Sequence, residues 1–237
     1  MKRMKTRLLL ILCLLIFCSC SETENKMQED LPDETFQTDE TDPTSADVME
    51  KYREVLLGNS SFYEPGTAED YNIAEIRSCL TDSEIEEVTV SSFTVIDLDD
   101  DGIEEVILWP AANGNEEWAT QTFGCVILHS IGDKVYGYPR WYRMFYQVKT
   151  DGTFWSSGGA GNSGFGKYKF TEQEVVHERI TYCETYTDEN GQQQVRFIVN
   201  GLEATQEDYD LETDKQDAKP DVQKHRYTEE NVKKYIS

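Results

Sequence analysis

The chain has 237 residues, with 46 acidic side chains against 22 basic ones and a formal net charge of −24 at pH 7. A negative field of this size disfavours nucleic acid, anionic lipid surfaces and other polyanions as partners, and it suits cationic partners and metal ions. About 190 residues follow the N-terminal segments described below, which is enough for one domain with a substantial core.

The first predicted element is a secretory signal over residues 1–19. A basic start with Lys2, Arg3, Lys5 and Arg7 precedes an apolar run at residues 8–17, which ends before Ser19 and Cys20. The apolar run covers about ten residues, half of what a helix needs to cross a bilayer. The order basic, apolar, small residue and cysteine is typical of an export signal that ends in a lipidation site. The alternatives are a plain secretory signal and an uncleaved anchor.

This segment resembles the lipobox of bacterial lipoproteins, in which the cysteine becomes the first residue of the mature chain. The resemblance implies that Cys20 carries a diacylglyceryl thioether, and Ser19 supplies the small side chain that the signal peptidase needs. Two or three acyl chains, such as palmitate, give stable anchoring. We therefore expect a lipid anchor on the outer face of the cell membrane, in an envelope of Gram-positive type.

Residues 20–47 then form an expected tether. After Cys20 this segment carries ten acids against one basic residue, Lys26, with many Thr residues and few apolar side chains. Such a composition cannot bury enough surface to offset the entropy of ordering, so we expect a disordered spacer. Its r.m.s. span is roughly 30 Å, increased by charge repulsion. The spacer would hold a folded domain away from the membrane.

Residues 48–237 are predicted to form one globular α+β domain. Apolar residues at helical spacing predict an amphipathic helix over 48–56, with Ser45 or Asp47 as N-cap, and a weaker helix over 68–80. Short β-rich runs separated by turn residues follow. The expected strands are residues 88–96, 105–109, 123–129, 134–138, 141–149, 153–156, 167–170, 174–187 and 193–199.

Turn signals between these runs decide the predicted topology. Asp151-Gly152 and Asn190-Gly191 are strong hairpin signals, and Gly132-Asp133 separates two further runs. Successive hairpins favour an antiparallel β-meander, curved or barrel-like. Helices are expected again at the C-terminus, over 205–215 and, after the cap Thr228, over 229–236.

The one chemical motif is an acidic loop at residues 95–108. It places carboxylates at Asp97, Asp99, Asp101 and Glu105, and Gly102 allows the reversal that brings Glu105 back to the others. Odd spacing in a tight loop turns these side chains towards one point. Hard oxygen ligands in this number suit Ca²⁺ better than Mg²⁺. The alternative is an acidic turn without an ion, in which the carboxylates would repel one another.

The loop is not an EF-hand, because Leu108 stands at the twelfth position, where a bidentate Glu is required. It resembles the shorter D-x-D-x-D-G-x-x-[DE] loop that joins two strands in FG-GAP and VCBS-type repeats, and a similar hairpin in uncharacterised lipoproteins of Gram-positive bacteria. The resemblance implies ligation by the four side chains named above and by the Ile103 carbonyl, with Asp100 and Glu104 outside. We expect a structural calcium ion.

The glycine-rich segment 158–167 matches two phosphate-binding patterns, but a β-rich run follows it where those patterns need a helix. We therefore expect no nucleotide site. The segment is interpreted as a flexible hairpin loop and a candidate binding lip, formed by Trp155, Asn162, Ser163 and Phe165.

The remaining cysteines and histidines carry little signal. Cys79, Cys125 and Cys183 have no zinc-type spacing and are expected to be buried. The alternative is that two of them form one disulfide. His129, His177 and His225 are isolated and are interpreted as surface or packed residues.

No catalytic constellation stands out in the sequence. The leading hypothesis is a lipid-anchored extracytoplasmic domain, stabilised by calcium, that binds an envelope glycan, peptide or protein. The alternative is a cell-envelope hydrolase that uses a carboxylate pair, which need not be close along the chain. A solute-binding component of a transporter is a weaker alternative, because such receptors usually need two lobes.

Overall fold

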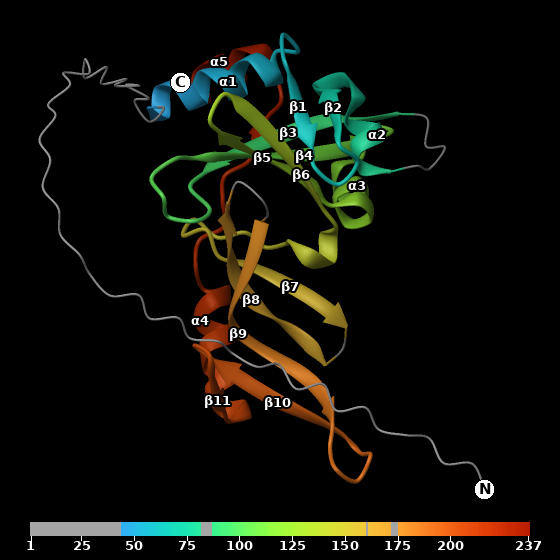
Figure 1. Cartoon of the computed structure of the whole chain (residues 1–237), viewed down its shortest axis with the longest axis vertical. Helices are drawn as coiled ribbons and strands as arrows, with labels where there is room; N and C mark the ends of the chain where they lie inside the picture. Colours follow the sequence, from blue (N-terminus) through green and yellow to red (C-terminus); the bar gives the residue numbers. More distant parts are fainter. Residues whose placement is uncertain (1–43, 82–86, 160, 172–174) are drawn as a thin grey trace, which may run out of the picture. The chain divides into compact units, whose positions relative to one another are not determined.

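The strands form two β-sheets in the computed structural model (Figure 1). The structure describes residues 44–81, 87–159, 161–171 and 175–237, all of which belong to one compact unit, Thr41–Ser237. The first sheet has the strand order β12-β3-β4-β5-β6-β1-β2, and the second has the order β11-β10-β9-β8-β7.

The strands of the first sheet are β1 (Ser61–Glu64), β2 (Glu69–Asn72), β3 (Val88–Ile96), β4 (Glu105–Ala112), β5 (Cys125–Ile131), β6 (Lys134–Arg140) and β12 (His225–Arg226). From β3 to β6 they form an antiparallel meander. The β1–β2 hairpin then joins β6 in parallel, through the single pair Tyr63↔Tyr136. Every residue of β4 is buried, so this strand is covered on both faces.

Helices cover one face of the first sheet, where α1 (Ser45–Leu56) and α5 (Glu229–Tyr235) lie side by side (Figure 1). Thr44 caps α1 by accepting a hydrogen bond from the Asp47 amide, at 3.3 Å. The buried face of α1 carries Val48, Met49, Tyr52, Val55 and Leu56. Each buried aliphatic side chain of this kind contributes about 1.5–3 kcal/mol. They share a core with Val106 and Leu108 of β4 and with α2 (Ile76–Leu80) and α3 (Glu116–Phe123).

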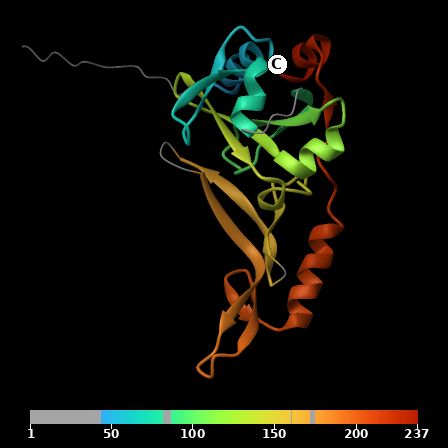
Figure 2. The ribbon, with the colours of Figure 1, turned by 90° about the vertical axis from the view of Figure 1, so that its right-hand side faces the viewer.

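The second sheet contains β7 (Phe154–Gly159), β8 (Asn162–Phe170), β9 (Val175–Thr187), β10 (Gln193–Val199) and β11 (Leu202–Ala204). Helix α4 (Gln206–Asp217), capped by Thr205, runs along one side of it (Figure 2). A second apolar core joins the sheets, because Ile107 and Ile127 of the first pack with Phe154 and Phe170 of the second.

The C-terminal segment forms contacts that stabilise both sheets. The Lys149 amine is buried and donates to the carbonyl oxygens of Asp217 (3.2 Å) and Lys219 (3.1 Å) and to Asp221 Oδ1 (2.7 Å). Beyond these residues, β12 pairs with β3, and α5 packs against α1. Residues near the end of the chain thus complete both the first sheet and its helical cover.

The strands predicted for 88–96 and 193–199 are confirmed to the residue, as are the turns at Gly132 and Gly191. The barrel-like expectation is wrong for the described residues, which form two open sheets. The α+β class with mostly antiparallel pairing is shown. The tether boundary at 47 also moves, because Ser45 already begins α1.

Two predicted elements take other forms. The helix predicted for 68–80 is helical only from Ile73, in η1 (Ile73–Glu75) and α2, because Glu64 accepts hydrogen bonds from the amides of Gly66 and Thr67 and closes a β1–β2 hairpin instead. The strand predicted for 141–149 contains the 3₁₀ turn η2 (Tyr142–Met144), and Gln147 has a left-handed φ of 49°. A left-handed residue breaks a regular strand.

The glycine-rich segment is not a loop over most of its length. Gly158 and Gly159 end β7, whereas Gly164 and Gly166 lie inside β8, and the two strands pair with each other. The glycines are required by close backbone packing: a Cβ on Gly164 would lie 2.2 Å from the Thr181 carbonyl oxygen. Lack of a side chain here permits strand pairing that other residues would block.

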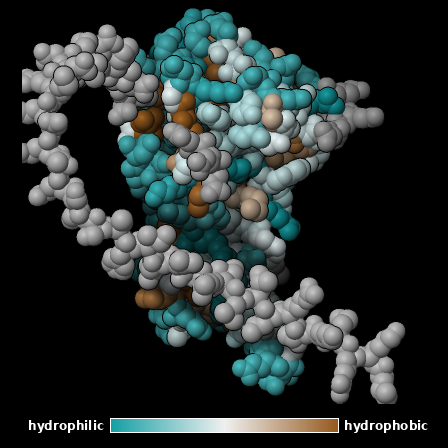
Figure 3. All heavy atoms as spheres, viewed as in Figure 1, coloured by the Kyte–Doolittle hydropathy of each residue, from teal (hydrophilic) through white to brown (hydrophobic). Residues whose placement is uncertain are grey.

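The face of the molecule seen in Figure 3 is largely hydrophilic, with hydrophobic residues in small separate patches. The most exposed aromatic side chain of the described residues is Trp141, at 61%. None of the described helices is long and apolar enough to span a bilayer.

Candidate metal centre

The acidic loop connects β3 to β4, which pair from Ile96↔Glu105 onward. Its backbone is shaped by its own carboxylates: Asp97 Oδ2 accepts a hydrogen bond from Gly102 N at 3.0 Å, and Asp101 Oδ1 accepts one from Ile103 N at 2.7 Å. Gly102 has a φ of 87°, which glycine adopts without strain. The sequence therefore folds this segment into a tight turn that directs carboxylates inward.

Three carboxylates converge in this turn. Asp97, Asp99 and Glu105 each offer an oxygen, and the three oxygens lie within 4.8 Å of one another. Asp97 Oδ1 and Asp99 Oδ1 are buried and have no hydrogen-bond partner among the described residues. A buried acceptor without a partner costs about 1–3 kcal/mol, and more when it is charged. The triad therefore contains two acceptors that a cation would satisfy.

Glu105 is the most deeply buried member of the triad and has no exposed surface. Its Oε2 accepts a hydrogen bond from Leu98 N at 2.8 Å, and its Oε1 lies 2.9 Å from His129 Nδ1. Burial raises the pKa of the Glu105 carboxyl to about 7, although the hydrogen bonds from His129 and Leu98 oppose the shift. A carboxylate held in this environment favours its charged form only when positive charge is nearby.

The pKa of Asp99 is also raised, for a similar reason. Burial raises its pKa and the negative charge of Asp101 adds to the effect, while the hydrogen bond from Phe170 N at 3.2 Å acts in the opposite direction. No Lys or Arg belongs to the triad. All three donors are carboxylate oxygens, the ligand type that Ca²⁺ and Mg²⁺ prefer over zinc or copper. The residues thus fit a hard divalent cation.

The structure separates the remaining residues of the predicted ligand set. Asp101 lies outside the converging triad, and one of its oxygens is already bonded to Ile103 N, while Ile103 is half-buried against the first core. Asp100, expected to point outward, has a left-handed φ of 61° and forms an ion pair with Lys167. The triad accounts for three of the four predicted side chains.

His129 is the residue of this site that sequence reasoning missed. Its ring stacks on Phe170 with centroids 4.4 Å apart, and its Nδ1 holds Glu105. His129 and Glu105 are 24 positions apart in the chain. They come together because β4 and β5 pair at Val106↔Leu128, one step from Glu105 and His129. Strand register was the only available signal. Residues that hold a ligand carboxylate in place typically tune its metal affinity.

The second sheet closes over the acidic loop. Phe170 N at the end of β8 bonds to Asp99, and Lys167 of the same strand pairs with Asp100. On another side, a Cβ on Gly152 would lie 2.8 Å from the Leu98 carbonyl oxygen, so only glycine permits this approach. The loop is therefore a junction between the two sheets.

The candidate binding lip is divided between the two faces of the second sheet. Trp155 and Phe165 pack edge to face at 5.9 Å, on the side of α4, where Trp155 Nε1 donates to Asp217 Oδ1 at 2.9 Å. Asn162 instead lines a small cavity of about 180 Å³ on the other face, whereas Ser163 lies on the same side as Phe165, with its Oγ 3.6 Å from Cys183 Sγ. The four residues do not form one surface.

The three cysteines of the domain are free, and burial raises the pKa of both Cys79 and Cys125 to about 12. The third, Cys183, is buried as well. A thiol with so high a pKa is unreactive. The predicted lipidation site, Cys20, the signal at 1–19 and nearly all of the tether lie outside the described residues.

Two larger cavities lie elsewhere. One of about 450 Å³ has four aromatic residues in its lining, Trp109, Tyr142, Phe145 and Tyr146. Another of about 410 Å³ carries Glu50, Glu54, Asp70 and Asp133. A glycosidase-type acid has a pKa raised by burial, but Glu50, Asp70 and Asp133 are exposed to solvent. Within the described linings, no observation favours the hydrolase alternative.

Comparison with protein-family models, with curated proteins and with solved structures gives no match to this chain. The argument about function therefore depends on the geometry above.

Proposed function

We propose that the chain is a lipid-anchored extracytoplasmic binding protein whose domain is stabilised by a calcium ion in the acidic loop. The observation that carries the calcium assignment is the pair of buried, unpartnered oxygens on Asp97 and Asp99 beside the buried carboxyl of Glu105. The side chains supply only oxygen ligands, and Ca²⁺ accepts further carbonyl and water oxygens to complete its shell.

The proposed role of the ion is structural. Phe170 N bonds directly to Asp99, and Lys167 pairs with Asp100, so the loop that would hold the ion also holds β8. An ion that fixes Asp97, Asp99 and Glu105 would therefore stabilise the junction of the two sheets. Glu105 is fully buried, which leaves no route for a substrate to reach that side of the ion.

The test is calorimetric titration of the full chain with Ca²⁺ and with Mg²⁺, together with thermal melts in Ca²⁺ and in a chelator. We expect one saturable Ca²⁺ site and weaker Mg²⁺ binding. At a free Ca²⁺ concentration of 100 times Kd the gain in unfolding free energy is about 2.7 kcal/mol. Asp99→Asn should abolish the gain, whereas Asp100→Asn, a matched change at an outward residue of the same loop, should retain it.

The chelated protein provides a second criterion. Without the ion, Asp99→Asn should melt above the wild type, because the substitution removes a carboxylate whose pKa is raised by burial and by Asp101. With calcium the order should reverse. Absence of saturable binding, or equal melts of both variants under both conditions, would contradict the calcium assignment.

The anchor is tested separately by metabolic labelling with an alkyne fatty acid. Cys20→Ala should lose the label and release the chain from the membrane, whereas Cys18→Ala should retain both. Labelling that survives Cys20→Ala would refute lipidation at this position.

A further inference from the structure

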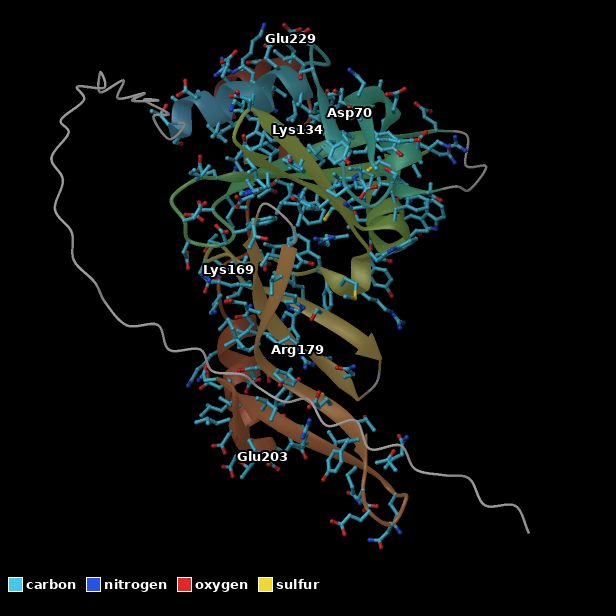
Figure 4. The ribbon with its side chains drawn as sticks, in the orientation of Figure 1. Asp70, Lys134, Lys169, Arg179, Glu203 and Glu229 are labelled. Carbon is cyan, nitrogen blue, oxygen red and sulfur yellow. The ribbon has the colours of Figure 1, made fainter. Side chains whose placement is uncertain are left out.

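Two adjoining cavities form a groove on the second sheet. They measure about 330 and about 180 Å³ and share Met144 and His177 in their linings. We define the β7–β9 groove by the side chains of Arg140, Met144, Asn162, Tyr168, His177 and Arg179. Arg179, on β9, is labelled in Figure 4.

A β-bulge places Tyr182 of β9 on the same face as Arg179 and His177. Phe165 pairs with Thr181 but Gly166 pairs with Arg179, so Ile180 is an extra residue on β9. Side chains alternate along a strand, and an extra residue reverses the alternation beyond it. Arg179 and Tyr182, three positions apart, consequently meet on one face, with the guanidinium 3.7 Å from the ring centroid.

Glycines in β8 make room for these side chains. A Cβ on Gly166 would lie 2.8 Å from His177 Nε2, and one on Gly164 would lie 2.5 Å from Tyr182 Cβ. The glycine-rich segment, which the metal site does not use, thus allows His177 and Tyr182 to sit close to β8.

The groove holds nitrogen groups that lack partners. Arg140 Nε and His177 Nε2 are buried and have no hydrogen-bond partner among the described residues. No carboxylate of the described chain lies within ion-pair distance of Arg140, whose guanidinium faces the Tyr168 ring at 5.0 Å. A partly buried cation without a counter-charge is costly, so Arg140, whose Nη1 donates to the Pro139 carbonyl oxygen at 3.0 Å, still presents its Nε to an anion.

The described lining contains no acidic residue, although the chain carries 46 of them. Burial lowers the pKa of His177 to about 4, and the charges of Arg179 and Arg140 add to this shift. The imidazole is therefore neutral at physiological pH. The long-range repulsion of an anion by the acidic chain is screened beyond about 8 Å at physiological salt.

The rest of the lining is neutral and polar, with an aromatic residue at the mouth. Ser156 and Asn162 offer a hydroxyl and an amide group, and Trp141 is 61% exposed. The hydroxyl groups of a sugar can form hydrogen bonds with the serine and asparagine side chains. The apolar face of the sugar ring can pack on the indole of Trp141. The guanidinium groups of Arg140 and Arg179 suit a carboxylate.

We propose that the β7–β9 groove binds an acidic sugar, a hydroxyl-bearing ring that carries a carboxylate, with Arg140 and Arg179 at the carboxylate and Trp141 against the ring. The inference rests on the proposed role as a binding protein, because it names the ligand class of that protein, but it does not rest on the calcium ion.

The experiment titrates the full chain with a tetrasaccharide that contains glucuronic acid and with the same tetrasaccharide after reduction of its carboxyl groups. We expect saturable binding of the acidic form and binding at least about tenfold weaker for the reduced form. Arg140→Gln and Arg179→Gln should each weaken the acidic form by about tenfold. Arg143→Gln is the charge-matched control, since Arg143 is exposed and lies outside the groove, and it should bind as the wild type does.

Several outcomes would overturn the proposal. These are equal binding of both tetrasaccharides, equal binding by all variants, no binding by the wild type, or an acidic peptide that binds more tightly than the sugar. Titrations in calcium and in chelator separate this proposal from the preceding one. Loss of sugar binding with a normal calcium-dependent melt overturns only the groove assignment, and sugar binding without any calcium effect overturns only the ion.

Discussion

The acidic loop and the β7–β9 groove both gather charge of one sign, but they are built in different ways. The triad of the loop comes from one hairpin, with Asp97, Asp99 and Glu105 within nine residues. The cations of the groove come from β6 and β9, and only the fold places both Arg140 and Arg179 where their charges act on His177. A contiguous site is organised largely by local backbone geometry, whereas a dispersed site depends on strand pairing and on a bulge.

In both regions the protein itself compensates only part of the charge. Glu105 has His129 and the Leu98 amide as partners, while Asp97 and Asp99 each keep one buried oxygen without any. In the groove, Arg179 has Glu184 at 3.5 Å, and Arg140 has no described carboxylate. Each region thus combines an internally paired group with an unpaired one, and the charge of the unpaired group is opposite to that of the ligand proposed for the region.

The largest expected effect concerns the paired group of the loop. Glu105→Ala leaves His129 Nδ1 and Leu98 N buried without an acceptor, so we expect a loss of about 3–5 kcal/mol in the free energy of unfolding. Glu105→Gln keeps hydrogen-bonding capacity and should lose clearly less, although it also weakens calcium binding. Urea unfolding in chelator measures both, and similar losses would show that the hydrogen bonds to Glu105 contribute little.

The next comparison uses one glycine from each region. Gly166→Ala places a methyl group 2.2 Å from the Glu178 carbonyl oxygen, and overpacking of this kind costs about 1–3 kcal/mol. Gly102→Ala in the loop meets nothing within 4 Å, and its φ of 87° leaves only backbone strain of about 1–2 kcal/mol. We expect Gly166→Ala to be the more destabilising and also to weaken sugar binding. The reverse order in urea unfolding would refute the close packing of β8 on β9.

A smaller effect depends on pH and tests the groove. Because burial and two arginines lower the pKa of His177 to about 4, the unfolded chain takes up a proton that the folded chain excludes. The stability from this group is present above about pH 6.5 and is lost as the pH falls towards 4. His177→Gln should reduce this acid-dependent loss, as measured by urea unfolding at pH 7, 5.5 and 4.5. Parallel curves for both proteins would contradict a neutral, buried imidazole.

The smallest effect concerns the ion pair between the loop and β8. Asp100 is largely exposed in its pair with Lys167, and exposed pairs contribute about 0–1 kcal/mol. Lys167→Gln should therefore lower the unfolding free energy by less than about 1 kcal/mol, with a difference that shrinks in high salt. Calcium affinity should stay within about twofold of the wild type. A large loss would mean that this pair, rather than the Phe170–Asp99 hydrogen bond, holds the junction.

The features that could be predicted from the sequence are those that depend on local patterns. The strands β3 and β10 were found because β-rich runs end in turn residues, and the acidic triad was found because its members are close in the chain. Helix α3 was missed although it carries a recognisable start, Asn115 as N-cap with Glu116 and Glu117 in the first turn, and ends at Gly124. That omission was avoidable.

Other features have no local signal. His129 reaches Glu105 through the register of β4 and β5, and Arg140 meets His177 through the packing of β6 and β9. The bulge at Ile180 leaves no mark that composition reveals, yet it decides which side chains line the groove. The segment at 141–149 was predicted as a strand because it is a β-rich run that precedes the turn at Asp151-Gly152, and its turns arise from packing against β7 and the C-terminal residues.

The three carbonyl and carboxylate partners of the buried Lys149 amine bear on how the protein matures. They lie 68 to 72 residues later in the chain, and the closing strand β12 and helix α5 come later still. Contacts between residues this far apart form slowly, because the intervening segment must first be closed. Completion of the fold therefore depends on residues that follow Lys149 at a distance, and a chain truncated before β12 leaves the first sheet without its edge strand and terminal helix, and open to proteolysis.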